Sequence, residues 1–231
     1  MGNPFRKIGA FVDENRHLFI LLYFIVYLIW FTLIEKHITA NFHIIHTPID
    51  DLIPFCEYFV VPYVLWFAYI AWGILYFGFR NVDEFFKLCM FLFTGMTLFL
   101  VISTVYPNGH YLRPTYFTHH NVFTQLCSII YKSDTATNLF PSIHCYNSLG
   151  VHFAVMTSRE FRHNKVGRFI SLILCISIIL ATMFIKQHSC FDVITGIMLA
   201  AIMYHLVYVQ DIFRRKPKTP GKLAHGTMEK K

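Results

Sequence analysis

Charged side chains are scarce in this sequence of 231 residues, where Asp, Glu, Lys and Arg together make up only 14%. Hydrophobic residues reach 55%, and this composition excludes an ordinary soluble globular domain. The six cysteines form no CxxC pair, which excludes motifs built on that spacing and favours buried free thiols. The sequence does not decide whether two of Cys127, Cys145 and Cys190 form a disulfide. The sequence also shows no internal repeat and no low-complexity tract.

Long apolar segments account for this composition. A membrane-spanning helix needs roughly 20 mainly apolar residues. The sequence therefore predicts an all-α polytopic membrane protein, a bundle of six transmembrane helices. These lie at about residues 17–35, 54–79, 85–105, 142–158, 166–185 and 189–210. The fourth is the shortest and contains Asn147 and His152.

Lys and Arg residues are distributed unevenly around the predicted helices. With the N-terminus in the cytoplasm, 16 of the 20 basic residues lie on the cytoplasmic side, as the positive-inside rule requires. We therefore expect both termini in the cytoplasm and the protein in the plasma membrane. Residues 1–16 form a basic arm, 17–210 the membrane domain and 211–231 a basic tail. Because basic ends beside membrane spans attract anionic lipids, the net charge of +7 predicts a membrane partner and no nucleic acid.

Polar residues gather at the ends of three apolar segments. In chain order they are Arg113-Pro114, Pro141-Ser142-Ile143-His144, and His188 with Asp192. In the orientation above, all three clusters fall on the extracytoplasmic face. Because polar side chains at membrane depth are costly, their gathering on one face indicates a functional site.

The residue types in these clusters suit phosphoryl transfer. Ser142 is a good helix N-cap, and the start of a helix binds phosphate through free backbone N–H groups. His144, in the first turn, is then placed to act as a general acid. His188 and Asp192 are four residues apart and share one helical face, so the carboxylate can orient the imidazole for attack. Arg113 offers a planar fork for two phosphate oxygens.

The ordered clusters resemble the three motifs of the type 2 phosphatidic acid phosphatase superfamily, KxxxxxxRP, PSGH and SRxxxxxHxxxD. The resemblance covers a core of about residues 54–210, with isoleucine in place of the glycine in the second motif. It implies that His188 attacks phosphorus and becomes phosphohistidine. It further implies that Asp192 orients this histidine and that His144 protonates the leaving group.

The resemblance also implies that Arg113 and Ser142 hold the phosphoryl oxygens and that no metal or other cofactor is needed. Two cations of the family pattern are absent from this chain. Tyr106 stands at the position of the first-motif lysine, and Ala181-Thr182 stands at the Ser-Arg of the third motif. Lys186, two residues before the third-motif histidine, is a candidate replacement for substrate binding.

These expectations describe a metal-independent lipid phosphatase that hydrolyses a lipid-linked phosphate or diphosphate at the extracytoplasmic face. Candidate substrates are phosphatidic acid, phosphatidylglycerol phosphate and polyprenyl diphosphate, each reaching the site laterally from the outer leaflet. The reduced set of cations also resembles the inositol phosphorylceramide and sphingomyelin synthases, which transfer a phospho-headgroup between lipids. A third possibility is a non-catalytic membrane scaffold or transporter that keeps only the shell of the fold.

Overall fold

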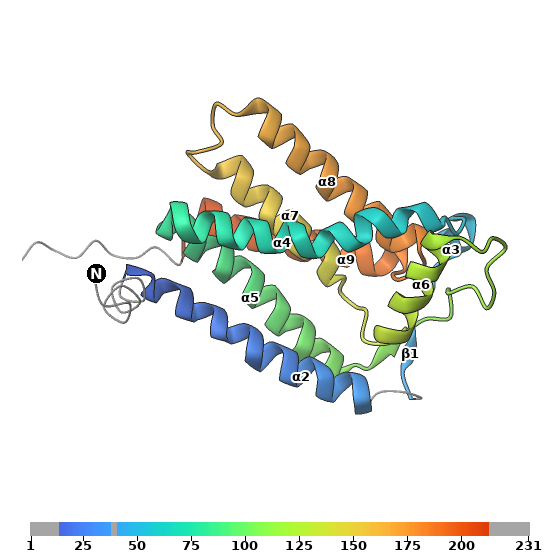
Figure 1. The fold of residues 1–231 in the computed structure, drawn as a ribbon. Helices are drawn as coiled ribbons and strands as arrows, with labels where there is room; N and C mark the ends of the chain where they lie inside the picture. The colour runs from blue at the N-terminus through green and yellow to red at the C-terminus, as the bar shows by residue number, and fades with distance from the viewer. Residues whose placement is uncertain (1–13, 38–40, 213–231) are drawn as a thin grey trace, which may run out of the picture.

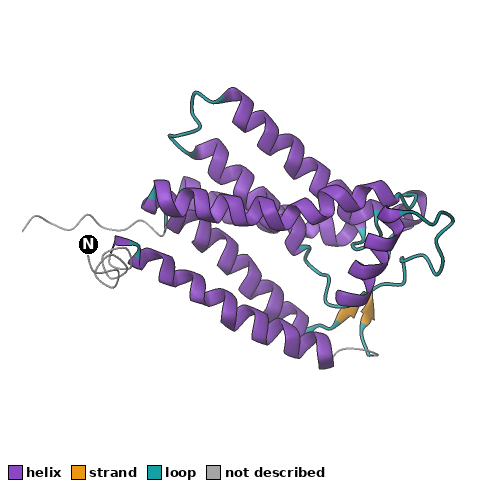
Figure 2. Cartoon of the chain, in the orientation of Figure 1, coloured by secondary structure: helices purple, strands orange, loops and turns teal. Residues whose placement is uncertain are grey.

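The computed structural model describes residues 14–37 and 41–212, so most of the predicted basic arm and nearly all of the basic tail lie outside the described residues. The described part is mostly helical (Figures 1 and 2), which confirms the predicted all-α fold class. Its elements are η1 (Arg16–Leu22), α2 (Tyr23–His37), β1 (His43–Ile44), α3 (Pro48–Leu52), η2 (Glu57–Phe59), α4 (Val60–Arg80), α5 (Val82–Val105), β2 (Asn108–Gly109), α6 (Val122–Ser133), α7 (Ile143–Thr157), α8 (Lys165–Phe184), α9 (Cys190–Tyr204) and the π-helical turn η3 (His205–Val209).

Five of the described helical segments are long and apolar enough to cross a membrane, as expected of an integral membrane protein. They are Arg16–His37, Glu57–Arg80, Val82–Val105, Lys165–Phe184 and Cys190–Val209. The fourth predicted span corresponds to α7, which has 15 residues. At 1.5 Å per residue it is about 22 Å long, less than the hydrocarbon core of about 30 Å. The structure therefore confirms five of the six predicted spans by length, and α7 is a shorter helix enclosed by the others.

Helix α7 occupies the centre of the bundle, where it packs against α4, α5, α8 and α9. Tyr146 is fully buried, stacks on the ring of Phe91 at 4.6 Å and donates its hydroxyl to the Phe91 carbonyl at 2.6 Å. Gly95 on α5 makes this approach possible, because a Cβ there would lie 2.0 Å from the Tyr146 ring. This packing against α5 holds the first turn of α7 in place.

Helix α2 lies at the edge of the bundle along α5 (Figure 1). Ile34 is its one buried residue, whereas large apolar side chains such as Ile25 and Ile29 are more than half exposed. A helix with apolar side chains on most of its circumference is stable only where lipid replaces water. The outer surface of α2 is therefore a lipid-facing surface.

The connections that carry the predicted site gather at one end of the bundle, together with α3, α6 and the two short strands (Figure 1). Strands β1 and β2 are parallel and pair His43 with Asn108 and Ile44 with Gly109. Residues 106–141, which lie between two of the predicted spans, contain a further helix, α6. Asn121 starts α6 by accepting the Thr124 N–H at 2.9 Å.

Candidate active site

The first part of the site is the start of α7. Ser142 is the N-cap, and its hydroxyl oxygen accepts the Cys145 N–H at 3.3 Å. This confirms the predicted helix start at the second polar cluster. His144 follows in the first turn, where its ring lies between those of Tyr63 and Trp66 on α4, with centroids 4.8 and 4.4 Å away.

The second part is the start of α9. Ser189 is its N-cap, and the Ser189 N–H donates to Asp192 Oδ2 at 2.9 Å, completing a capping box. His188 therefore lies just before the helix, outside the helical face that the four-residue spacing had led us to expect it to share with Asp192. The capped turn still brings Asp192 Oδ2 to 3.5 Å from His188 Nδ1.

The two helix starts are joined directly through the backbone. The Ser142 N–H donates to the Asp192 carbonyl at 3.0 Å. Gly196, one turn further along α9, permits this contact, because a Cβ there would lie 2.8 Å from the Ser142 carbonyl oxygen. The second and third polar clusters are thus held together by main-chain contacts.

The two histidines meet at this junction. His144 Nδ1 lies 3.2 Å from His188 Nε2, and the His188 side chain is only 5% exposed. Burial, reinforced by the nearby charge of Arg113, lowers the pKa of His188 to about 3. The imidazole is therefore neutral at working pH. Its Nε2 faces His144, and its Nδ1 is on the side of Asp192.

Arg113 lies beside this pair but uses its donors on the protein. Its guanidinium donates to the carbonyls of Asp134 at 2.8 Å and Thr135 at 2.9 Å, and to the side-chain oxygen of Gln187. Carbonyls at the end of a helix attract cations, and here they belong to the end of α6. Arg113 Nε is buried without a partner. Gln187, which the motif analysis passed over, thus connects this arginine to the backbone next to His188.

Lys186 points away from the histidines. Its ammonium donates to the carbonyls of Asp50 at 2.7 Å and Ile53. The predicted replacement cation is therefore attached to α3 and its following turn. Ser142 is likewise fully buried, with its hydroxyl oxygen engaged as the helix cap.

Asp50 is a site-supporting residue that the sequence reading missed. Its carboxylate accepts the Ser189 hydroxyl at 2.6 Å and the Cys190 N–H at 2.7 Å. It also accepts the Thr47 N–H at 2.7 Å as part of the capping box of α3. The Thr-Pro-Ile-Asp pattern at residues 47–50 is a capping-box signal that identifies α3, but no sequence signal links it to α9.

Asp134 is a second missed residue, located where α6 ends. Its Oδ2 accepts the Tyr63 hydroxyl at 3.2 Å and the Gln187 side-chain amide at 3.4 Å. Burial raises the pKa of Asp134 to about 6, although the charge of Arg113 opposes this shift. A carboxyl group that titrates close to neutral pH therefore lies in the same enclosure as the histidines.

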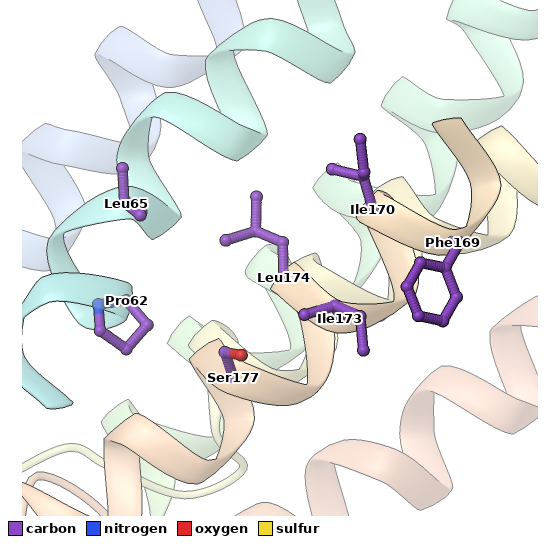
Figure 3. A pocket seen from close by; sticks show the side chains of 7 residues that line it. All are labelled: Pro62, Leu65, Phe169, Ile170, Ile173, Leu174 and Ser177. Carbon is purple, nitrogen blue, oxygen red and sulfur yellow. The ribbon is translucent and has the colours of Figure 1, made fainter. Parts of the chain in front are cut away.

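The two histidines and Asp134 line one end of a cavity of about 690 Å³. His144, His188, Asp134 and Asn138 form its polar end, and the remaining wall is mainly aromatic and aliphatic. A smaller recess of about 460 Å³ between α4 and α8 is lined by apolar side chains and Ser177 (Figure 3). That recess has no ionisable lining residue, so the chemistry belongs to the larger cavity.

The six cysteines are all free, so no disulfide joins any two of Cys127, Cys145 and Cys190. Within residues 14–37 and 41–212, no group of three or more His, Cys, Asp or Glu side chains is arranged to hold a metal ion.

The fold and site define a helical membrane protein with two neighbouring histidines and a buried carboxylate at one end of the bundle. The family model of the PAP2 superfamily matches residues 112–216, a segment that contains all three polar clusters. This match over residues 112–216 agrees with the resemblance to the type 2 phosphatidic acid phosphatase superfamily. The chain matched no curated protein and no solved structure. A match to this superfamily suggests a membrane phosphatase or phosphotransferase.

Replacing Asp50 by Ala should destabilise the protein and disturb the site. Four donors, two from Thr47 and one each from Ser189 and Cys190, lose their common acceptor, which predicts a loss of about 2–4 kcal/mol. Thermal unfolding in detergent measures this loss, at about 2–4 °C in Tm per kcal/mol.

The matched control is Asp51→Ala. Asp51 is the next residue, its side chain is 65% exposed, and it contacts only the exposed His46 ring among the ion pairs described. Its replacement should change Tm by no more than about 2 °C. Equal destabilisation by both substitutions would contradict the role given to Asp50.

Proposed function

We propose that this protein is an integral membrane phosphatase that hydrolyses a lipid-linked phosphate or diphosphate through phosphohistidine, without a metal. The observation that supports it most is the 3.2 Å approach of His188 Nε2 to His144 Nδ1 at the polar end of an otherwise apolar cavity. A neutral, oriented imidazole and a second imidazole beside it are the two groups that such a reaction needs.

In the first step, His188 Nε2 attacks the phosphorus while Asp192 holds the Nδ1 proton and stabilises the charge that develops on the ring. A P–N bond forms and the P–O bond to the lipid breaks. The departing oxygen takes its proton from His144. Because the protein encloses both rings, the attacking and departing groups are positioned without freedom to diffuse.

In the second step, water gives a proton to His144 and attacks the phosphohistidine. The P–N bond breaks, a new P–O bond forms and inorganic phosphate leaves. The N-terminal turn of α7, capped by Ser142, supplies backbone N–H groups for the phosphoryl oxygens. Arg113 contributes its charge at close range and, through Gln187, fixes the backbone segment that carries His188. Lys186 acts by holding α3 against the start of α9.

The substrate is proposed to be a lipid because the cavity that reaches the histidines is apolar along most of its length. Phosphatidic acid, phosphatidylglycerol phosphate and polyprenyl diphosphate remain the candidates. The positive-inside distribution supports an active site on the extracytoplasmic face, in a plasma membrane with both termini inside.

A second candidate function is transfer of a phospho-headgroup to a lipid alcohol. Asp134 favours it, because a carboxylate at the polar end of the cavity can accept the hydroxyl of an acceptor. Arg113 and Lys186 also have their donors engaged with the protein, which suits a phosphodiester with one negative charge better than a monoester with two.

Purified protein with long-chain phosphatidic acid in EDTA should release orthophosphate, and His188→Ala should lower the rate by at least about 10³-fold because the nucleophile is lost. The rate is measured as orthophosphate released over time. His120→Ala, an exposed histidine of the 106–141 segment, is the control and should retain the rate. Equal loss in both variants, or unchanged release by His188→Ala, would contradict the assignment.

Asp134→Asn should lower the ratio of transfer to hydrolysis by about 3- to 10-fold, the effect of weakening one hydrogen bond to the acceptor. A labelled phospholipid is supplied with a lipid alcohol, and labelled lipid product and orthophosphate are counted. In the unsubstituted protein, transfer should fall as pH drops through about 6, because protonation of Asp134 removes the negative acceptor.

Ser133→Ala, which changes the neighbouring residue of the same cavity wall, should leave the ratio unchanged. Orthophosphate as the sole product at every pH would leave hydrolysis as the function and reject the transfer role of Asp134.

Protease added outside intact cells should cut after Lys132, which lies on the outer side in the proposed orientation. Immunoblotting for fragments detects the cut, and Lys132→Gln removes it. Cleavage only after the membrane is permeabilised would reverse the orientation.

A further inference from the structure

The cavity of about 690 Å³ continues well beyond the two histidines. Past its polar end, the wall consists mainly of side chains from α2, α4 and α5, among them Phe31, Trp66, Ile70 and Phe99, together with Asn147 of α7. We call the part of the cavity beyond the histidines the slot. Apolar and aromatic side chains make up most of its wall, so water gains little by filling it.

The slot is long in the direction of the bundle. Helix α4 contributes wall residues from Tyr63, beside His144, to Leu75. Twelve residues of helix rise correspond to about 18 Å, more than half the hydrocarbon thickness of a bilayer. The slot therefore runs from the site into the depth of the membrane alongside α4.

The slot is bordered by lipid on the side of α2. That helix supplies Phe24, Tyr27, Leu28 and Phe31 to the wall while most of its remaining apolar side chains are exposed. An occupant thus has an apolar path from the bilayer, and its polar end meets His188. A hydrocarbon chain attached to a phosphate has this chemistry.

We propose that the slot holds one hydrocarbon chain of the lipid substrate and thereby selects for long chains. The inference rests on the proposed function, since it places the attached phosphate at His188. A chain that reaches further down the slot removes more apolar surface from contact with polar groups, so affinity increases with length until the slot is filled.

Ala71 offers a way to shorten the slot. It lies on the wall eight residues after Tyr63, about 12 Å along α4, and it has the smallest side chain of the wall. It is not part of the packed core, because its side chain is exposed. Ala71→Phe should therefore fill the lower slot without disrupting the fold.

Ala68→Phe is the matched control. Ala68 is also exposed and lies one turn earlier on α4, but it lines neither the slot nor the recess between α4 and α8 (Figure 3). The two variants introduce the same side chain on the same helix and differ in whether it enters the slot.

The kinetic arm compares dioleoyl with dihexanoyl phosphatidic acid. Ala71→Phe should lower kcat/KM for the long-chain lipid by about tenfold or more, the effect of losing the burial of two or more methylenes, and change the short-chain value by less than about twofold. Ala68→Phe should change neither. Equal effects on both lipids, or the same effect in both variants, would overturn the slot.

The binding arm needs no turnover and uses Trp66, which lines the slot. With Trp30 and Trp72 replaced by Phe and His188 by Ala, phosphatidic acid brominated on its chains should quench Trp66 fluorescence in a saturable manner. Ala71→Phe should weaken this quenching about tenfold, and Ala68→Phe should not. If Ala71→Phe leaves the quenching unchanged, the slot proposal is wrong, whatever the kinetic arm shows. If Ala71→Phe weakens the quenching selectively but the kinetic arm detects no hydrolysis, the phosphatase function is rejected and the slot is kept.

Discussion

The hydrogen bond from the Ser142 N–H to the Asp192 carbonyl is the contact on which the geometry of the site depends. It joins the first residues of two helices whose starts carry His144 and His188. Because this contact is made by the backbone, side-chain rotation does not loosen it. Gly196 lets α7 and α9 approach closely enough for it to form, and the buried ring of Tyr146 fixes α7 against α5. The histidine pair is consequently positioned by main chain and core packing.

Asp192 makes several of the contacts that define the site. Its Oδ2 caps α9 through the Ser189 N–H and lies beside His188 Nδ1, while its carbonyl accepts from Ser142. A carboxylate that already accepts a backbone donor is fixed in orientation, so it can hold the imidazole proton in place. The stability of the helix start and the orientation of the His188 ring are therefore coupled through one side chain.

The sequence was a good guide to features that depend on local pattern. Apolar runs located the five long helices, and the Ser142 cap was predicted from residue type alone. Helix α6 escaped notice because its 12 residues have exposed polar positions and too few apolar ones to resemble a span. Helix α7 was predicted as a sixth span, and its 15 residues, most of them buried against the other helices, are too few to confirm this by length.

Contacts between segments distant in sequence were beyond prediction. Lys186 was expected to face a phosphate, yet its partners are carbonyls of residues 50 and 53, more than 130 positions away. Asp50 was missed for the same reason. No periodicity or motif spacing encodes the docking of α3 on α9, because it depends on how the first outer connection folds back over the bundle.

The partners of Arg113 and Lys186 bear on the class of substrate. A dianionic monoester needs several free donors, whereas these two cations already satisfy carbonyls that would otherwise be left without partners. Moving either cation onto a phosphate would leave those carbonyls unpaired, so the protein resists using them as direct ligands. In the proposed function, phosphate binding then depends more on the α7 N-terminus and on the anchoring of the lipid chain. An enzyme that worked in this way would gain affinity from the apolar part of its substrate and reserve the two histidines for the transition state.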